Sequence, residues 1–111
     1  YIYTSIGGIM YRSTTPTLIF NIKNTGFDMT TIDICHVTVE GFMGTPKIIY
    51  ENPDIDTTNK KISVVMSQEE TKQFDVGNVK IQLKIKLNNG SVVCSPIITK
   101  DMNEILEEAI L

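Results

Sequence analysis

Hydrophobic and polar residues alternate along most of the chain with the period of two that is typical of β-strands. The longest such stretch covers residues 79–87, where apolar residues alternate with Lys80, Gln82, Lys84 and Lys86 without a break. Successive side chains of a strand point to opposite faces, so this stretch predicts a strand with one buried and one solvated face. Shorter alternating stretches predict further strands at residues 16–22, 31–40, 46–50, 62–66 and 91–98.

Two of these stretches are irregular. Within residues 31–40 the two isoleucines occupy even positions, whereas Val37 and Val39 occupy odd ones. A β-bulge inserts one extra residue and shifts the phase in this way, and we expect it at Cys35 and His36. Pro96 interrupts the last stretch, and because proline has no N–H to donate, we expect an edge or a bulge there.

Turn and helix signals separate the strands. Residues 88–90 read Asn-Asn-Gly between two alternating stretches, which predicts a tight hairpin. Ser67, followed three residues later by Glu70, matches a capping box and predicts a short helical turn near residues 67–74. A helical spacing of apolar residues after Asp101 predicts a short amphipathic helix with a stripe made of Met102, Ile105, Leu106, Ala109 and Ile110.

Isoleucine and valine dominate the apolar residues, with 17 Ile and 8 Val against 5 Leu and a single Ala. β-Branched residues pack well on a pleated surface and lose rotamer freedom in a helix, so this composition favours strands. A chain of 111 residues corresponds to one core. We therefore predict an all-β fold, an immunoglobulin-like β-sandwich of about six to seven antiparallel strands, with a partly closed barrel as the alternative.

The expected organisation has three segments. Residues 1–13 form an N-terminal arm or a tag-derived segment, residues 14–99 the sandwich, and residues 100–111 the C-terminal amphipathic helix. The hallmarks of antibody domains are absent, since the chain has no Trp. If residues 79–87 are the penultimate strand, Cys94 lies on the last one, so Cys35 and Cys94 do not form the usual bridge between sheets. We expect both to be buried thiols.

The charge of the chain excludes some classes of binding partner. The formal net charge is −3, the pI is near 5.0, and Arg12 is the single arginine. Nucleic-acid binding uses clustered basic side chains, so we expect no nucleic acid. The three lysines of residues 79–87 share one face of a strand, which we interpret as a solvated face. We also expect no membrane span and no signal peptide, because residues 1–9 lack a basic start and a long apolar run.

Candidate catalytic and metal-binding residues are few. His36 is the only histidine, and in a regular strand its side chain and that of Cys35 point to opposite faces. Asp54 and Asp56 resemble the start of a calcium loop, but the central Gly and the distal Glu of that motif are missing, which favours a polar turn. We therefore predict no catalytic residues, no cofactor and no metal, and expect that the protein is not an enzyme.

Two segments are candidates for contacts with partner proteins. Residues 1–6 have low charge and β-propensity, so Tyr1, Tyr3 and Ile6 could add as a strand to a sheet edge, their own or a neighbour's. A disordered or tag-derived tail is the alternative. In the predicted C-terminal helix the stripe that contains Met102, Ile105 and Leu106 packs either over its own sandwich or on another chain.

Three segments carry a resemblance to a known group. They are residues 14–20 (Thr-Thr-Pro-Thr-Leu-Ile-Phe), 67–71 (Ser-Gln-Glu-Glu-Thr) and 79–85 (Val-Lys-Ile-Gln-Leu-Lys-Ile), followed by the Asn-Gly turn and a Pro-Ile-Ile-Thr strand. Over about residues 11–105 the chain resembles small structural proteins encoded in prophages of low-GC Gram-positive bacteria, which are similar to the immunoglobulin-like N-terminal module of phage baseplate proteins.

The resemblance implies a structural or adaptor protein of a phage tail or baseplate that works by assembly, without catalysis. Its implied partners are other tail or baseplate proteins, or further copies of the chain as a homo-oligomer. The implied location is the bacterial cytoplasm during assembly and the virion afterwards. The alternative is a carbohydrate- or cell-surface-binding β-sandwich module, although such sites commonly present exposed aromatic side chains and this chain is only 7% aromatic.

Overall fold

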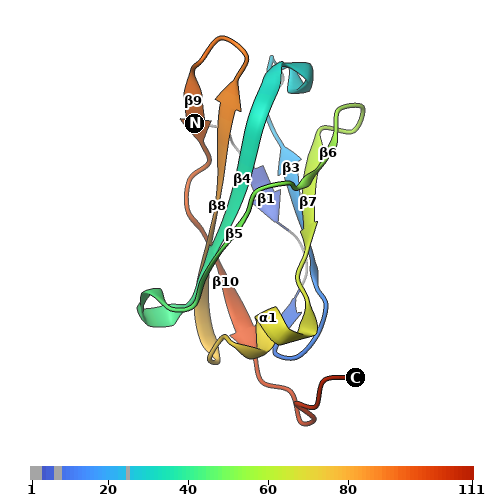
Figure 1. Cartoon of the computed structure of the whole chain (residues 1–111), viewed down its shortest axis with the longest axis vertical. Helices are drawn as coiled ribbons and strands as arrows, with labels where there is room; N and C mark the ends of the chain where they lie inside the picture. The colour runs from blue at the N-terminus through green and yellow to red at the C-terminus, as the bar shows by residue number, and fades with distance from the viewer. Residues whose placement is uncertain (1–3, 7–8, 25) are drawn as a thin grey trace.

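The computed structural model describes residues 4–6, 9–24 and 26–111, which form two β-sheets packed face to face (Figure 1). Sheet A has the strand order β1-β3-β7-β6, and sheet B has the order β2-β10-β8-β4-β5, with β9 also paired to β8. The strands of sheet A are β1 (Thr4–Ile6), β3 (Thr17–Ile22), β6 (Asp54–Asp56) and β7 (Lys61–Val65). Those of sheet B are β2 (Met10–Tyr11), β4 (Ile32–Glu40), β5 (Lys47–Tyr50), β8 (Gly77–Leu87), β9 (Val92–Cys94) and β10 (Ile98–Asn103).

Neighbouring strands run antiparallel, except that β2 runs parallel to β10. Among the described residues, three short helical segments join the strands: η1 (Met29–Thr31), η2 (Phe42–Gly44) and α1 (Gln68–Lys72). The prediction of an all-β sandwich is therefore confirmed at the level of two packed sheets.

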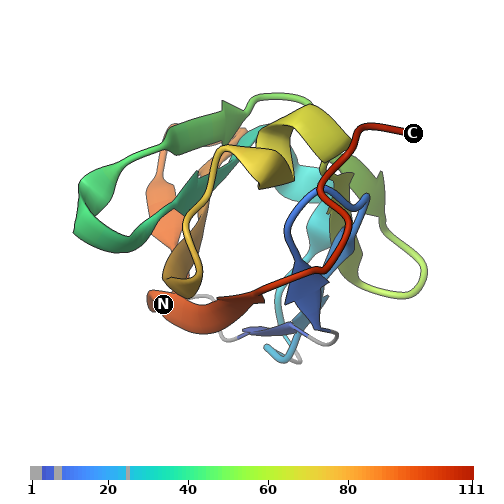
Figure 2. The same cartoon turned by 90° about the horizontal axis from the view of Figure 1, so that it is seen from below.

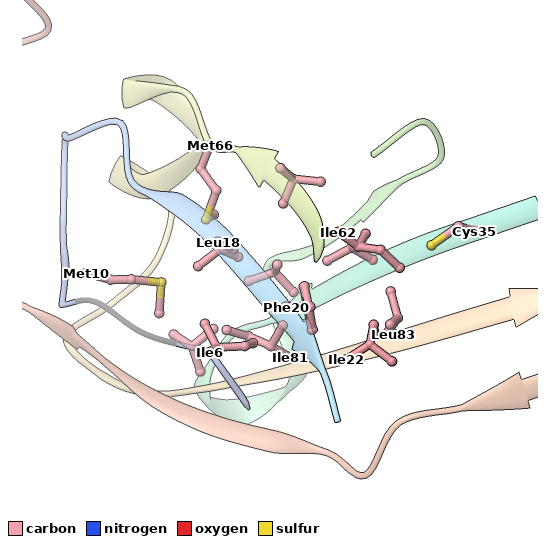
Figure 3. Close-up of a cluster of buried hydrophobic side chains, with 14 of the residues drawn as sticks. Ile6, Met10, Leu18, Phe20, Ile22, Cys35, Ile62, Met66, Ile81 and Leu83 are labelled. Carbon is pink, nitrogen blue, oxygen red and sulfur yellow. The ribbon is translucent and has the colours of Figure 1, made fainter. Parts of the chain in front are cut away.

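The core lies between the two inner faces. In β8 the residues Val79, Ile81, Leu83 and Ile85 are fully buried, while the lysines between them are exposed, as the alternation predicts. Figure 3 shows Phe20 and Ile62 of sheet A gathered with Ile81 and Leu83 of sheet B in one apolar cluster. Strict alternation is thus the signature of a sheet that buries one face.

The phase change in β4 is present, but its position was predicted wrongly. The register of β4 against β8 shifts between Ile32 and Ile34, two residues before the expected place. Cys35 is therefore already in phase with Val37 and buried, whereas Ile34 is exposed. Ile34 and Cys35 are both apolar and adjacent, so the pattern alone could not distinguish which of them faces the core.

The predicted hairpin after β8 is confirmed. The N–H of Leu87 donates to the carbonyl of Ser91 at 2.8 Å, and that of Gly90 donates to the carbonyl of Leu87 at 2.9 Å. Beyond it, the last predicted strand is split into β9 and β10, which both pair antiparallel with β8. The interruption covers residues 95–97 and includes Pro96, which agrees with the bulge expected there.

The predicted helical turn is confirmed as α1. The N–H of Glu70 donates to Oγ of Ser67 at 3.1 Å, and the N–H of Ser67 donates to Oε1 of Glu70 at 2.8 Å. Both halves of the capping box are therefore formed. The same carboxylate also accepts a hydrogen bond of 3.0 Å from the hydroxyl of Tyr50, which ties α1 to β5. Seen from below in Figure 2, α1 (yellow) crosses one end of the sandwich.

The predicted C-terminal helix over residues 100–111 is wrong. Residues up to Asn103 belong to β10, and residues 104–111 have no regular secondary structure. The pattern supported both structures, because Met102 lies two residues after Lys100 and four after Ile98 and so also has the inward parity of a strand. An isolated helix of about eight residues is marginal in water, whereas β8 offers backbone hydrogen bonds along its edge.

The N-terminal residues that the structure describes are part of the sheets and not a separate arm. Residue Thr4 pairs with Ile22 at the edge of sheet A, and Met10 pairs with Met102 at the edge of sheet B. The chain therefore adds β1 and β2 to its own sheet edges. For residues 4–6 this is the first of the three possibilities that the sequence left open, the others being a neighbour's sheet edge and a disordered or tag-derived tail.

Candidate protein-binding surface

The six predicted contact residues lie in different environments. Tyr1 and Tyr3 lie outside the described residues. Ile6 and Met102 are buried in the core, so neither is presented to a partner. Of the other two, Ile105 is half-buried and Leu106 is fully exposed. Ile6 and Met102 differ from the prediction because strand pairing turns their side chains inward, whereas Leu106 lies after the end of β10.

The outer face of sheet B carries the clearest concentration of charge. Strand β8 carries Lys80, Lys84 and Lys86 on this face. The edge strand β5, which lies on the other side of β4, adds Lys47. All four are exposed. The register places Glu40 opposite both Lys47 and Lys80, and Asp101 of β10 lies on the same outer face opposite Asn78, whereas Lys84 and Lys86 lie further along β8. We call this surface the lysine face, and it consists of residues 34, 36, 38 and 40 of β4, 47 and 49 of β5, 80, 82, 84 and 86 of β8, 92 and 94 of β9, and Ile97.

Exposed apolar side chains surround these lysines. Ile34 and Val92 lie on either side of Lys86, each directly opposite it in a neighbouring strand. Ile49 lies opposite Thr38 on the β5 side. These side chains are about half exposed (Ile34 45%, Ile49 50%, Val92 55%). Residues opposite one another on a sheet have Cβ atoms about 5 Å apart, so the apolar and basic groups form one continuous surface.

The side chain of Ile97 extends this surface beyond β10. Ile97 is 58% exposed and lines a small hollow of about 40 Å³ together with Thr38, Lys80 and Gln82. The interruption between β9 and β10 therefore places an isoleucine over the outer face of the sheet, where a continuous edge strand would not. Exposed apolar side chains that lie together beside charged groups mark a candidate surface for contacts with protein.

The arrangement of His36 and the cysteines separates groups that a nucleophilic site would bring together. Cys35 points into the core and His36 points to the outer face, as expected for adjacent residues of a strand. On that face Lys84 pairs with His36 on one side and with Cys94 on the other, so an ammonium group stands between the imidazole and the second thiol. Both cysteines are free.

The two thiols are expected to differ strongly in reactivity. Burial raises the pKa of the Cys35 thiol to about 12, so it remains protonated at pH 8, and its side chain is also inaccessible. Cys94 is half-buried, which corrects the expectation that both are buried. Treating the native protein with iodoacetamide at pH 8 should modify Cys94 alone, and denaturant should expose Cys35, as peptide mass spectrometry would report. Equal labelling of both in the native state would contradict the burial of Cys35.

The predicted polar turn after Asp54 is satisfied within itself. The carboxylate of Asp56 accepts hydrogen bonds from the N–H groups of Thr58 and Asn59, each at 3.1 Å, and from Nδ2 of Asn59 at 2.8 Å. The Asn59 side chain, then its backbone N–H, hold the pKa of Asp56 below its ordinary value. Within the described part of the chain no three His, Cys, Asp or Glu side chains are placed to hold a metal ion.

Clefts on the surface are shallow, and two of them border the lysine face: one of about 330 Å³ is lined by Glu40, Phe42, Met43 and Lys80, and one of about 210 Å³ includes Ile34. Two other clefts have volumes of about 340 Å³ each. One is lined by Tyr50, Pro53, Asp54 and Val64 where the chain passes from sheet B to sheet A. The other is lined by Phe27, Asp28 and Leu87 with the adjoining asparagines of the hairpin. Asp28 is engaged there, since its side chain accepts hydrogen bonds from the hydroxyl and the N–H of Thr30, which lower its pKa.

Comparison with known proteins finds no match: no protein-family model and no curated protein matches the chain. Among the described residues, no helix is long and apolar enough to cross a membrane.

The structure also reveals an exposed apolar loop between the predicted strands 31–40 and 46–50. Between β4 and β5, Phe42 is 59% exposed and Met43 is 84% exposed, and Met43 has a positive φ of 71°. The N–H of Gly41 donates to the carbonyl of Pro46 at 2.8 Å, which closes the loop. An apolar pair between two turn glycines was the available signal, because loop tips are usually polar.

Proposed function

We propose that this protein is a non-catalytic structural or adaptor component of a phage or prophage tail or baseplate, built on an immunoglobulin-like domain, and that it acts by binding other protein chains through the lysine face. Other tail or baseplate proteins are the partners of this proposal, and assembly in the bacterial cytoplasm followed by incorporation into the virion is its setting. The resemblance of residues 11–105 to prophage structural proteins motivates the biological part.

The strand order supports the immunoglobulin-like part of the proposal. In the lettering of that fold, sheet A corresponds to strands A, B, E and D, and sheet B corresponds to G, F, C and C′ with a short strand beside G. The short helix α1 then lies between strands E and F. The chain departs from antibody domains in its core, since it has no Trp and since β8, the equivalent of strand F, carries no cysteine.

The observation that carries the binding function is the composition of the lysine face. Four exposed lysines and four half-exposed apolar side chains come together from four strands and a loop. A strand face that contacts only solvent does not require apolar side chains such as Ile34, Ile49, Ile97 and Val92. Basic groups increase the association rate with acidic partners, and apolar groups contribute affinity once water is excluded.

The test is a charge reversal on this face. The variant K84E/K86E should fold like the wild type, because both lysines are exposed, but should bind its tail or baseplate partner at least about tenfold more weakly. The matched control is K23E/K61E, which makes the same change in net charge at exposed lysines that lie outside the lysine face. Binding to the proteins encoded beside it would be measured by calorimetry.

Three results would contradict the proposal. The first is the absence of binding to every neighbouring tail or baseplate protein. The second is equal affinity of the lysine-face variant and the control variant. The third is a glycan-array signal that the K84E/K86E substitutions do not change, which would favour the carbohydrate-binding alternative.

A further inference from the structure

The last eight residues concentrate negative charge. Residues 104–111, which we call the C-terminal segment, contain Glu104, Glu107 and Glu108 and no basic residue. The chain has 13 acidic and 10 basic residues, so without these three glutamates its acidic and basic residues balance at ten each. The net charge of −3 therefore equals the charge of this segment, and the rest of the chain is neutral overall while the lysine face is basic.

The segment is anchored to its own domain at a few points. The carboxylate of Glu108 forms an ion pair with Arg12, and the hydroxyl of Ser13 donates to the carbonyl of Glu108 at 3.1 Å. The N–H of Leu111 donates to Oε1 of Gln68 at 3.1 Å. Figure 2 shows the segment (dark red) passing the turn before β3 and then α1, across the end of the sandwich. These contacts hold it at that end, where it does not cover the lysine face.

The anchored segment leaves its two leucine side chains in solvent. Leu106 and Leu111 are almost completely exposed, and Glu104 and Glu107 are exposed beside Leu106. Covering two almost completely exposed leucines with another apolar surface would be favourable, because apolar area leaves water. Such a surface must accept both leucine side chains and carboxylates, so it must be apolar and basic.

The lysine face has this complementary composition. Lys84 and Lys86 are two residues apart on one strand and project about 7 Å from each other, within reach of the carboxylates of Glu104 and Glu107 on one short segment. Ile34, Val92 and Ile97 supply apolar contacts for the leucines. When the segment lies on the lysine face, its carboxylates meet ammonium groups and its leucines meet apolar side chains. Two copies of the segment, or two copies of the face, would instead bring like charges together.

We propose that the lysine face binds the C-terminal segment of a second copy of this chain, so that copies associate head to tail. This inference rests on the proposed function only in taking the lysine face as a contact surface. The two surfaces differ, so the contact is heterologous and each copy keeps one free surface of each kind. Repetition then produces a ring if the rotation between copies closes and an open chain if it does not.

The contact is expected to be weak and sensitive to salt. One eight-residue segment buries less area than a standard interface of about 1,600 Å², so association belongs in the micromolar to millimolar range. Because its charges are exposed, raising the ionic strength to about 1 M shortens the Debye length to about 3 Å and should weaken it.

The experiment is sedimentation equilibrium of the wild type and two charge-reversed variants. The wild type should show concentration-dependent association between about 10 µM and 1 mM at low salt, and less at high salt. K84E/K86E changes only the face, and E104K/E107K changes only the segment at glutamates that make no ion pair in the described structure. Each variant alone should self-associate at least about tenfold more weakly than the wild type. An equimolar mixture of the two variants should associate, because the basic segment of E104K/E107K then meets the acidic face of K84E/K86E. The control K23E/K61E should behave like the wild type.

The outcomes separate this inference from the proposed function. A wild type that remains monomeric at 1 mM and low salt overturns the inference, as does association that E104K/E107K leaves unchanged. If K84E/K86E nevertheless loses binding to a tail or baseplate protein, the proposed function stands and another acidic protein occupies the face. If the mixture of variants associates but no tail or baseplate protein binds, the inference stands and the proposed function fails.

Discussion

Replacing Phe20 by alanine is expected to lower the free energy of unfolding by about 3–5 kcal/mol. Phe20 is fully buried on β3, where it pairs with Ile6 of β1 and with Ile62 of β7. Its ring fills the space between the sheets, and alanine would leave a cavity that the surrounding strands cannot close. A domain of this size is stabilised by about 5–15 kcal/mol in total, so the loss is a large fraction of its stability.

The control for this substitution is the next residue of the same strand. Ile19 points to the outer face of sheet A and is 37% exposed. Ile19→Ala therefore removes apolar volume without creating an internal cavity, and we expect a loss of about 1 kcal/mol or less. Urea denaturation followed by circular dichroism would compare the two variants. Similar losses at both positions would contradict the placement of Phe20 in the core.

Replacing Ser95 by alanine is expected to cost about 1–3 kcal/mol, although only one oxygen atom is removed. Ser95 is fully buried at the interruption between β9 and β10. Its Oγ accepts a hydrogen bond of 3.0 Å from the N–H of Leu83 and donates one of 2.9 Å to the carbonyl of Pro96. Alanine would leave the buried N–H of Leu83 without a partner, and this desolvated donor is the main cost.

Amide hydrogen exchange gives a local measurement of this effect. In Ser95→Ala the amide of Leu83 should exchange faster than in the wild type, beyond the change that global stability explains. Ser91→Ala is the matched control, because Ser91 lies exposed in the hairpin that joins β8 to β9. Unchanged exchange at Leu83 would mean that the Ser95 hydroxyl does not satisfy its N–H.

The candidate surface was only partly visible in the sequence. The alternation over residues 79–87 places Lys80, Lys84 and Lys86 on one outer face, and the structure agrees. By itself that row indicates a solvated strand. The apolar residues Ile34 and Val92 join it only through pairing of β8 with β4 and β9, and strand partners are not encoded in the periodicity of any one strand. The proposed role of the surface therefore depends on tertiary contacts.

Local signals with a unique physical meaning were read correctly from the sequence alone. Strict alternation determined the buried and exposed sides of β8, the Asn-Gly turn determined the hairpin, and the Ser67 and Glu70 pair determined α1. The alternation in β8 requires only that one face of the sheet is covered, and the hairpin and α1 depend on contacts within about ten residues. Such contacts form with the same geometry whatever surrounds them.

Tertiary structure decided the segments whose pattern suits two structures. Met102 fits both the predicted helical stripe and the inward parity of a strand that begins at Ile98, and the edge of β8 makes the strand more favourable because it supplies partners for the backbone. The same competition for sheet edges places residues 4–6 and 10–11 in the sandwich. Backbone hydrogen bonds to distant strands outweigh weak local preference, and this is why the two ends of the chain could not be determined before the sheets were assembled.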